Sequence, residues 1–140
     1  MQETAVRFAI CDDDKTYAEK MKALILQTFQ LPQPVECVIY LNQEQILKYY
    51  REDKIDIVFM DIEFGDVIGF QVARRLSMQD SQLTVVYMTN YEHYITEAFV
   101  CRPLGFIRKS HAEDDLQIAG QEIRRFIGQK YSRFVFGGGT

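Results

Sequence analysis

The sequence lacks the features that mark several classes of protein. No apolar run approaches the roughly 18 residues of a membrane-spanning helix, and Arg7 interrupts the only early apolar stretch, so we expect neither a membrane span nor a secretory signal. The three cysteines form no Cys-x-x-Cys pair and only two histidines are present, which argues against a zinc site and for free thiols in a reducing cytoplasm. The net charge of −4 makes the chain a poor candidate for binding DNA or anionic lipid by itself.

What is present is an ordinary globular composition with a regular alternation of patterns. With 140 residues, 47% of them hydrophobic and 26% charged, the chain is long enough for one domain with a sizeable core. Short apolar runs alternate with longer helical patterns, and the middle runs are almost continuously apolar, as in strands buried on both faces. This alternation predicts an α/β fold, a doubly wound parallel sheet of five strands with five helices. The runs are 6–11, 37–41, 55–60, 83–88 and 104–107.

Local signals predict where several helices begin. Asp14 is the expected N-cap of the first helix. Asn42 with Gln45, and Ser110 with Glu113, have the spacing of capping boxes that start the second and fifth helices, and Gly69 opens the third. We expect residues 1–130 to form the domain, and the glycine-rich segment 131–140 to be a linker or a chain end outside the core.

Acidic side chains stand where two of the predicted strands end. In a doubly wound sheet the first and third strands are neighbours and ligands bind beyond the carboxyl ends of the strands, so Asp12, Asp13 and Asp61 should converge. Two carboxylates about 4 Å apart repel by roughly 4 kcal/mol at an effective dielectric of about 20. Either one acid is protonated or a cation lies between them. A small pocket of oxygen ligands suits Mg²⁺.

Two further residues complete a chemical pattern. Thr89 ends the fourth strand with a hydroxyl, and Lys109 follows the fifth strand with a positive charge. An aspartate that attacks phosphorus, with Mg²⁺ and a lysine neutralising the phosphoryl oxygens, would use this set of groups.

The motifs together resemble the receiver domain of a bacterial two-component response regulator. They are Phe8-Ala-Ile-Cys-Asp-Asp-Asp14, Val58-Phe-Met-Asp61-Ile-Glu, Gly69-Phe-Gln-Val-Ala-Arg-Arg, Val86-Tyr-Met-Thr89 and Phe106-Ile-Arg-Lys109. The resemblance as a whole covers about residues 5 to 130. The stretch from Asn90 to Phe99 and the stretch from Arg102 to Lys109 are similar to receivers of the LytR/AgrA type. The resemblance implies a flavodoxin-like receiver fold with strand order 2-1-3-4-5.

The resemblance also implies a role for each matching residue. Asp61 would be the phosphoacceptor, and Thr89 and Lys109 would contact the phosphoryl group. Mg²⁺ would be held by Asp13 and Asp61, with Asp12 helping through water and Glu63 through its backbone carbonyl. Phe106 occupies the position of the aromatic switch residue, where it moves together with Thr89.

The family's biology supplies the expected partners. A sensor histidine kinase would donate the phosphoryl group, and the receiver would control transcription in the cytoplasm as a signalling module rather than an enzyme. Activation would favour a homodimer through the face of the fourth helix, fifth strand and fifth helix. DNA would be contacted only by a C-terminal domain of the LytTR type, which would follow this chain.

Departures from the family pattern leave alternatives open. Ser110 stands where most of the family has a proline after the lysine. One alternative is therefore that the chain is a degenerate receiver, which binds partners without being phosphorylated. A second alternative is a small Mg²⁺-dependent aspartyl phosphatase, because such enzymes usually have a second acid two residues after the nucleophile, and Glu63 has this position relative to Asp61.

Overall fold

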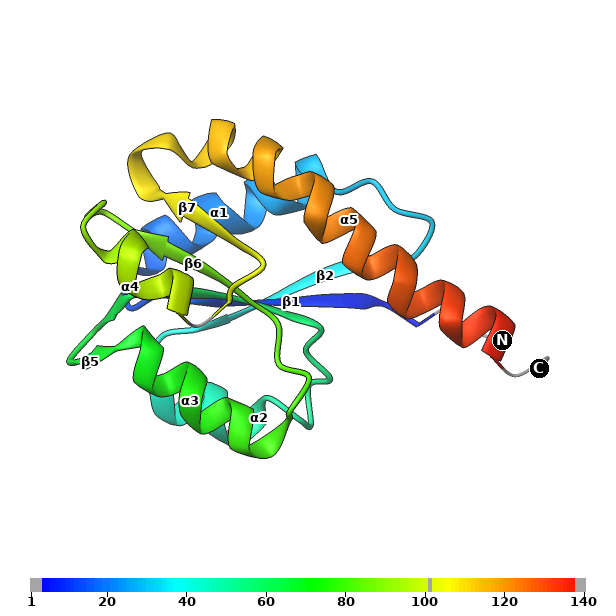
Figure 1. The fold of residues 1–140 in the computed structure, drawn as a ribbon, viewed down its shortest axis with the longest axis horizontal. Helices are drawn as coiled ribbons and strands as arrows, with labels where there is room; N and C mark the ends of the chain where they lie inside the picture. Colours follow the sequence, from blue (N-terminus) through cyan, green and yellow to red (C-terminus); the bar gives the residue numbers. More distant parts are fainter. Residues whose placement is uncertain (1–3, 101, 138–140) are drawn as a thin grey trace.

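Five parallel strands form the central sheet of the computed structural model, which describes residues 4–100 and 102–137, apart from the side chains at 99 and 133–137 (Figure 1). The strand order β2-β1-β3-β6-β7 is the predicted doubly wound order, because β6 and β7 are the fourth and fifth strands of the sheet. The expected strands are confirmed, with bounds that differ by at most two residues. They are β1 (Val6–Cys11), β2 (Val35–Tyr40), β3 (Ile57–Asp61), β6 (Val85–Thr89) and β7 (Gly105–Arg108).

Helices cover both faces of this sheet and create two hydrophobic cores (Figure 1). Helices α1 (Lys15–Thr28) and α5 (Ala112–Gly137) lie on one face. On the other face lie α2 (Gln43–Tyr49), α3 (Gly69–Gln79) and α4 (Tyr94–Val100). Successive strand residues point to opposite faces, so each central strand contributes to both cores. For this reason the central strands are apolar along almost their whole length.

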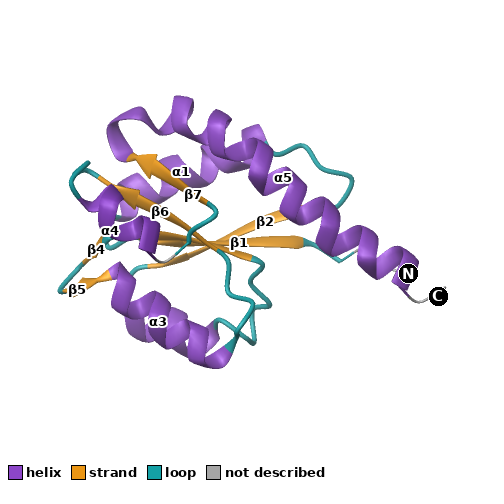
Figure 2. Cartoon of the chain, in the orientation of Figure 1, coloured by secondary structure: helices purple, strands orange, loops and turns teal. Residues whose placement is uncertain are grey.

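A short hairpin follows β3 that the sequence did not predict. Strands β4 (Glu63–Phe64) and β5 (Val67–Ile68) pair antiparallel, and Gly65 in the turn has a φ of 63° (Figure 2). Gly69 then begins α3 directly against the end of β3, and a Cβ atom at this position would collide with the backbone oxygen of Asp61. The hairpin and this glycine fix the chain on one side of Asp61.

The predicted helix starts are confirmed at Asp14, Asn42 and Gly69 and wrong at Ser110. The Asp14 carboxylate accepts the backbone N–H of Tyr17, and the Asn42 side chain accepts that of Gln45, so both are N-caps. Ser110 is not an N-cap, because it lies inside a 3₁₀ turn (Lys109–His111) that precedes α5. Its hydroxyl lies 2.9 Å from Nδ1 of His111 instead.

Helix α5 continues to Gly137, so residues 131–137 are helical, and 138–140 lie outside the described residues. That the segment 131–140 is a linker or a chain end stays a prediction. The carboxyl-terminal half of α5 is attached to the start of β3. Lys130 Nζ lies 2.5 Å from a carboxylate oxygen of the buried Asp56. The Tyr131 hydroxyl lies 3.0 Å from Asp56 Oδ2 and 3.2 Å from the Ala5 carbonyl oxygen. Asp56 therefore ties the end of α5 to the sheet.

We expect Tyr131→Phe to lower the free energy of unfolding by about 1 kcal/mol, since it removes one hydroxyl donor from two partly buried acceptors. Urea unfolding followed by circular dichroism measures the change. Tyr49→Phe is the control, because within the described residues the Tyr49 hydroxyl has no hydrogen bond. Equal midpoints for wild type and Tyr131→Phe would show that the Tyr131 hydroxyl does not stabilise the attachment of α5.

Two further expectations concern thiols and membranes. Cys11 and Cys37 are free thiols, as predicted, and Cys101 lies outside the described residues. Among the helices of the described chain, none combines the length and the apolarity that crossing a membrane would require.

Candidate functional site

Three carboxylates meet at the carboxyl edge of the sheet. Asp12 and Asp13 follow β1, and Asp61 is the last residue of the neighbouring β3. One oxygen from each carboxylate lies within 4.8 Å of the others. Asp12 and Asp61 are buried, with residue exposures of 0% and 4%, whereas Asp13 is exposed. The structure thus brings together the three acids that the strand pattern predicted to converge.

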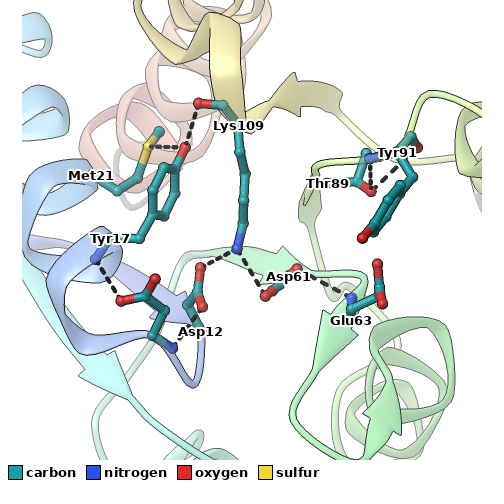
Figure 3. A network of polar contacts seen from close by, with 9 residues as sticks. Asp12, Tyr17, Met21, Asp61, Glu63, Thr89, Tyr91 and Lys109 are labelled. Carbon is teal, nitrogen blue, oxygen red and sulfur yellow. Dashed lines mark hydrogen bonds and ion pairs between the residues drawn. The ribbon is translucent and has the colours of Figure 1, made fainter.

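The ammonium group of Lys109 lies between the two buried acids (Figure 3). Its Nζ atom is 2.6 Å from Oδ2 of Asp12 and 3.0 Å from Oδ2 of Asp61. The lysine side chain is only 9% exposed. Burial lowers the pKa of Lys109, but its contacts with Asp12 and Asp61 outweigh this and the net pKa is raised. A permanent positive charge therefore offsets part of the repulsion between the carboxylates.

Asp61 has fixed partners for both of its oxygens. Its Oδ1 accepts the backbone N–H of Glu63 at 3.1 Å, and its Oδ2 accepts from Lys109. Burial raises the pKa of the Asp61 carboxyl to about 7, and the charge of Asp12 also raises it, although Lys109 opposes both effects. One lysine is too little positive charge for this cluster, so a further cation would be favoured here.

The Asp12 carboxylate shows where such a cation fits. Its Oδ1 accepts the backbone N–H of Asp14 at 2.9 Å. Its Oδ2 is fully buried and has no hydrogen bond of good geometry, and the close ammonium of Lys109 is its ion-pair partner. A buried anionic oxygen beside two other carboxylates is a donor set that suits Mg²⁺, which prefers hard oxygen ligands.

Three other predicted residues lie around this cluster in different ways. Glu63 is exposed and contacts Asp61 through its backbone N–H. Thr89 ends β6, but its hydroxyl is engaged by Tyr91: it accepts the Tyr91 N–H at 2.9 Å and donates to the Tyr91 carbonyl at 3.3 Å. Phe106 lies on β7, partly buried, and its ring stacks near Tyr87 at 6.5 Å. The roles expected for these residues remain predictions.

Sequence reasoning missed Tyr17 as a component of the site. Its hydroxyl donates to the backbone carbonyl of Lys109 at 3.3 Å, and its ring centroid is 4.7 Å from the Lys109 ammonium. The two residues are 92 positions apart, and Tyr17 belongs to no motif. Its spacing with other α1 residues indicated only a buried face.

The strand end that carries Lys109 is held by a second ion pair that the sequence did not reveal. Arg108 and Asp115 form two side-chain contacts of 2.9 Å, and the Arg108 backbone N–H donates to the same carboxylate at 2.8 Å. The Arg108 guanidinium lowers the pKa of the Asp115 carboxyl. This pair fixes the turn from β7 into α5, and it replaces the predicted cap at Ser110.

Comparison with known sequences places the chain among signalling proteins. The family model for the response regulator receiver domain matches residues 8–120. The sensory transduction protein LytT of Oceanobacillus iheyensis is 25% identical over 130 residues, covering 91% of this chain and 52% of the relative. LytR of Streptococcus mutans is 28% identical over 118 residues, covering 83% and 47%. The chain thus spans about half the length of these curated relatives.

Solved structures show the same fold. A response regulator receiver domain protein from Clostridium thermocellum superposes with a TM-score of 0.73 at 20% identity, covering 90% of this chain and 97% of that one. The response regulator TrrA from Thermotoga maritima, solved in complex with Mg²⁺–BeF, gives a TM-score of 0.71 at 21% identity, covering 86% and 98%. With the family match over most of its length, this chain belongs to the response regulator receiver domain family.

Proposed function

We propose that this chain is a phosphorylation-switched receiver in which Asp61 accepts a phosphoryl group from a phosphohistidine of a sensor histidine kinase. The observation that carries the proposal is the Lys109 ammonium, which lies within 3.0 Å of both Asp12 and Asp61 at the carboxyl edge of the sheet. A lysine and several carboxylates at this edge are the groups that phosphoryl transfer to an aspartate requires.

Asp61 acts as the nucleophile. The Glu63 N–H and the Lys109 ammonium orient its two oxygens. One oxygen forms a bond to phosphorus while the P–N bond of the phosphohistidine breaks, and the electron pair of that bond stays on the departing imidazole nitrogen. The product is an acyl phosphate, whose oxygens Lys109 and the Thr89 hydroxyl would contact.

The acidic cluster holds Mg²⁺ in this proposal. Its ligands are the carboxylates of Asp12, Asp13 and Asp61 together with the backbone carbonyl of Glu63. The buried Asp12 Oδ2, which lacks a good hydrogen bond, supports this assignment. When bound, the ion neutralises negative charge on the phosphoryl oxygens.

The switch runs through Thr89 and Phe106. If the Thr89 hydroxyl turns to the phosphoryl group, both of its hydrogen bonds with Tyr91 are lost, and the segment before α4 is released. Phe106 then repacks inward, and the surface of α4, β7 and α5 changes shape. That surface contains the exposed Ile118, and we propose it as the contact with a second copy.

The output of the switch is transcription control in the cytoplasm. The LytT and LytR relatives are about twice as long as this chain, and we propose that a DNA-binding domain of the LytTR type follows the receiver. DNA would be contacted only by that domain, since the receiver itself has a net charge of −4.

Incubation with acetyl phosphate and Mg²⁺ tests the proposal. We expect intact-mass spectrometry to show the gain of one phosphoryl group by wild type and none by Asp61→Asn, because an amide does not form the acyl phosphate. Asp66→Asn is the matched control, since Asp66 is an exposed acid in the neighbouring hairpin turn. Labelling of Asp61→Asn at another residue would refute the assignment.

The degenerate-receiver alternative makes the opposite prediction. It was kept open by Ser110, but Lys109 reaches both acids with Ser110 in place, and no peptide bond among the described residues is cis. Absence of labelling, with partner binding unchanged, would favour that alternative.

A further inference from the structure

Tyr17 touches Lys109 at both ends of the lysine. At the backbone, the Tyr17 hydroxyl donates to the Lys109 carbonyl at 3.3 Å. At the tip, the tyrosine ring lies 4.7 Å from the ammonium, within the range of a cation–π contact. Figure 3 shows the ring alongside the lysine side chain, on the side of Asp12. The lysine thus runs along the tyrosine from its backbone to the acids.

From these contacts we propose that Tyr17 is a positioning residue, whose ring holds the Lys109 ammonium between Asp12 and Asp61 and so sets the rate at which Asp61 gains a phosphoryl group. The inference deepens the proposed function and rests on it. The ring is assigned the main part, because a hydrogen bond of 3.3 Å is longer than the 2.5–3.0 Å typical of a hydroxyl donor.

A lysine side chain needs a packing partner if its ammonium group is to stay in one position. Its four-carbon chain has many rotamers, and fixing them costs conformational entropy. Among the described residues, the groups that approach the ammonium closely are the two carboxylates and the tyrosine ring. The ring adds an uncharged wall, which keeps water from the ammonium and strengthens its interaction with nearby negative charge.

Tyr17 is itself held in place. It lies in the first turn of α1, where its backbone N–H donates to the N-cap Asp14, and its ring packs against the hydrophobic core of that face. The Tyr17 hydroxyl also approaches the sulfur of Met21 at 4.0 Å. A ring fixed by the helix and the core can define the position of a flexible lysine.

Phosphorylation by acetyl phosphate gives a direct test. In this reaction an Asp61 oxygen bonds to phosphorus, the bond from phosphorus to the acetyl oxygen breaks, and acetate leaves with the electron pair. With Mg²⁺ present, we expect Tyr17→Leu to slow labelling about tenfold, the scale of a lost desolvated cation–π contact. Tyr17→Phe keeps the ring, so its rate should stay within about twofold of wild type.

Two controls separate positioning from a general loss of structure. Phe126→Leu removes a ring that lies 5.9 Å from Lys130, a lysine that pairs with Asp56 and not with the acidic cluster, and should leave the rate unchanged. In a Lys109→Ala background, Tyr17→Leu should produce no further loss, because its effect acts through the lysine. Urea midpoints check that each variant is folded.

A second readout needs neither Mg²⁺ nor phosphorylation. In NMR spectra of the metal-free protein, the Lys109 side-chain protons near the ring should show an upfield ring-current shift. Tyr17→Phe should retain that shift and Tyr17→Leu should lose it.

The outcomes separate this inference from the function on which it rests. If wild type is not labelled at all, the proposed function fails and the inference falls with it. If wild type is labelled and folded Tyr17→Leu is labelled at the same rate, the inference alone is overturned. If Tyr17→Phe is as slow as Tyr17→Leu, the assignment to the ring is wrong.

Discussion

Replacing Lys109 by methionine should lower the free energy of unfolding at pH 8 by about 3 kcal/mol or more in the absence of divalent cations, the cost of leaving buried charge without its partner. Methionine keeps most of the aliphatic length but carries no charge. Asp12 and Asp61, both buried, would then face each other with no cation between them.

The loss should depend on pH in a defined direction. As the pH falls toward 5, the Asp61 carboxyl takes up a proton, because burial and the charge of Asp12 already raise its pKa to about 7 with the lysine present. One neutral acid removes the repulsion, so the difference between wild type and Lys109→Met should shrink at low pH.

Urea unfolding in EDTA at pH 8 and pH 5 measures both effects. Lys48→Met is the matched control, because Lys48 is exposed on α2 and its loss should change stability by no more than about 0.5 kcal/mol. A difference that stays the same at both pH values would contradict the charge argument and would point to lost packing of the lysine chain.

The strand ends could be predicted because they depend on local pattern and topology alone. Each buried strand is marked by a run of apolar residues, and parallel strands place their carboxyl ends on one edge. It follows that Asp12, Asp13 and Asp61 meet, and that Lys109 lies near them. The structure confirms that these four residues lie together.

What the sequence did not reveal depends on contacts between distant segments. Tyr17 meets Lys109 across 92 residues, and only the rotation of α1 against β7 decides that its ring faces the lysine. The Thr89 hydroxyl could have faced the acids, but it forms hydrogen bonds with the backbone of Tyr91 in the next loop instead. No periodicity encodes either choice.

The end of α5 was missed for a related reason. Glycines from 137 to 139 suggested that the helix stops early, because glycine is a poor helix former. Contacts between Tyr131, Lys130 and the buried Asp56 stabilise the preceding turns. Tertiary contacts therefore extend a helix beyond the point where local propensity favours its end.

Removing the charge of Asp61 should have the opposite effect to removing that of Lys109. In EDTA at pH 8, we expect Asp61→Asn to be more stable than wild type by about 2 to 4 kcal/mol, since each unit of pKa shift corresponds to about 1.4 kcal/mol. The variant leaves Lys109 paired with Asp12, and one positive charge then balances one buried negative charge.

The direction of this stability difference follows from how many protons the folded and unfolded states bind. Burial and Asp12 raise the pKa of Asp61 in the folded protein from 3.8 to about 7. Between these values the folded state binds more protons than the unfolded state, so wild type loses stability as the pH rises. The stabilising contribution of the protonated acid is complete below about pH 4 and is lost by about pH 8. Asparagine does not titrate, so Asp61→Asn lacks this pH-dependent loss.

Urea unfolding of both proteins from pH 4 to pH 8 should therefore give a stability difference that grows with pH. Mg²⁺ should reverse the order at pH 8, because in our proposal it binds the folded wild type, and a concentration of 1,000 Kd would add about 4.1 kcal/mol. Asp61→Asn lacks one of the three carboxylates and should gain much less. A difference between the two proteins that is independent of pH and of Mg²⁺ would mean that Asp61 is not the strained acid of the cluster. In our proposal, the same repulsion that destabilises the metal-free protein gives the site its affinity for a cation, because the ion would offset the negative charge that folding brings together.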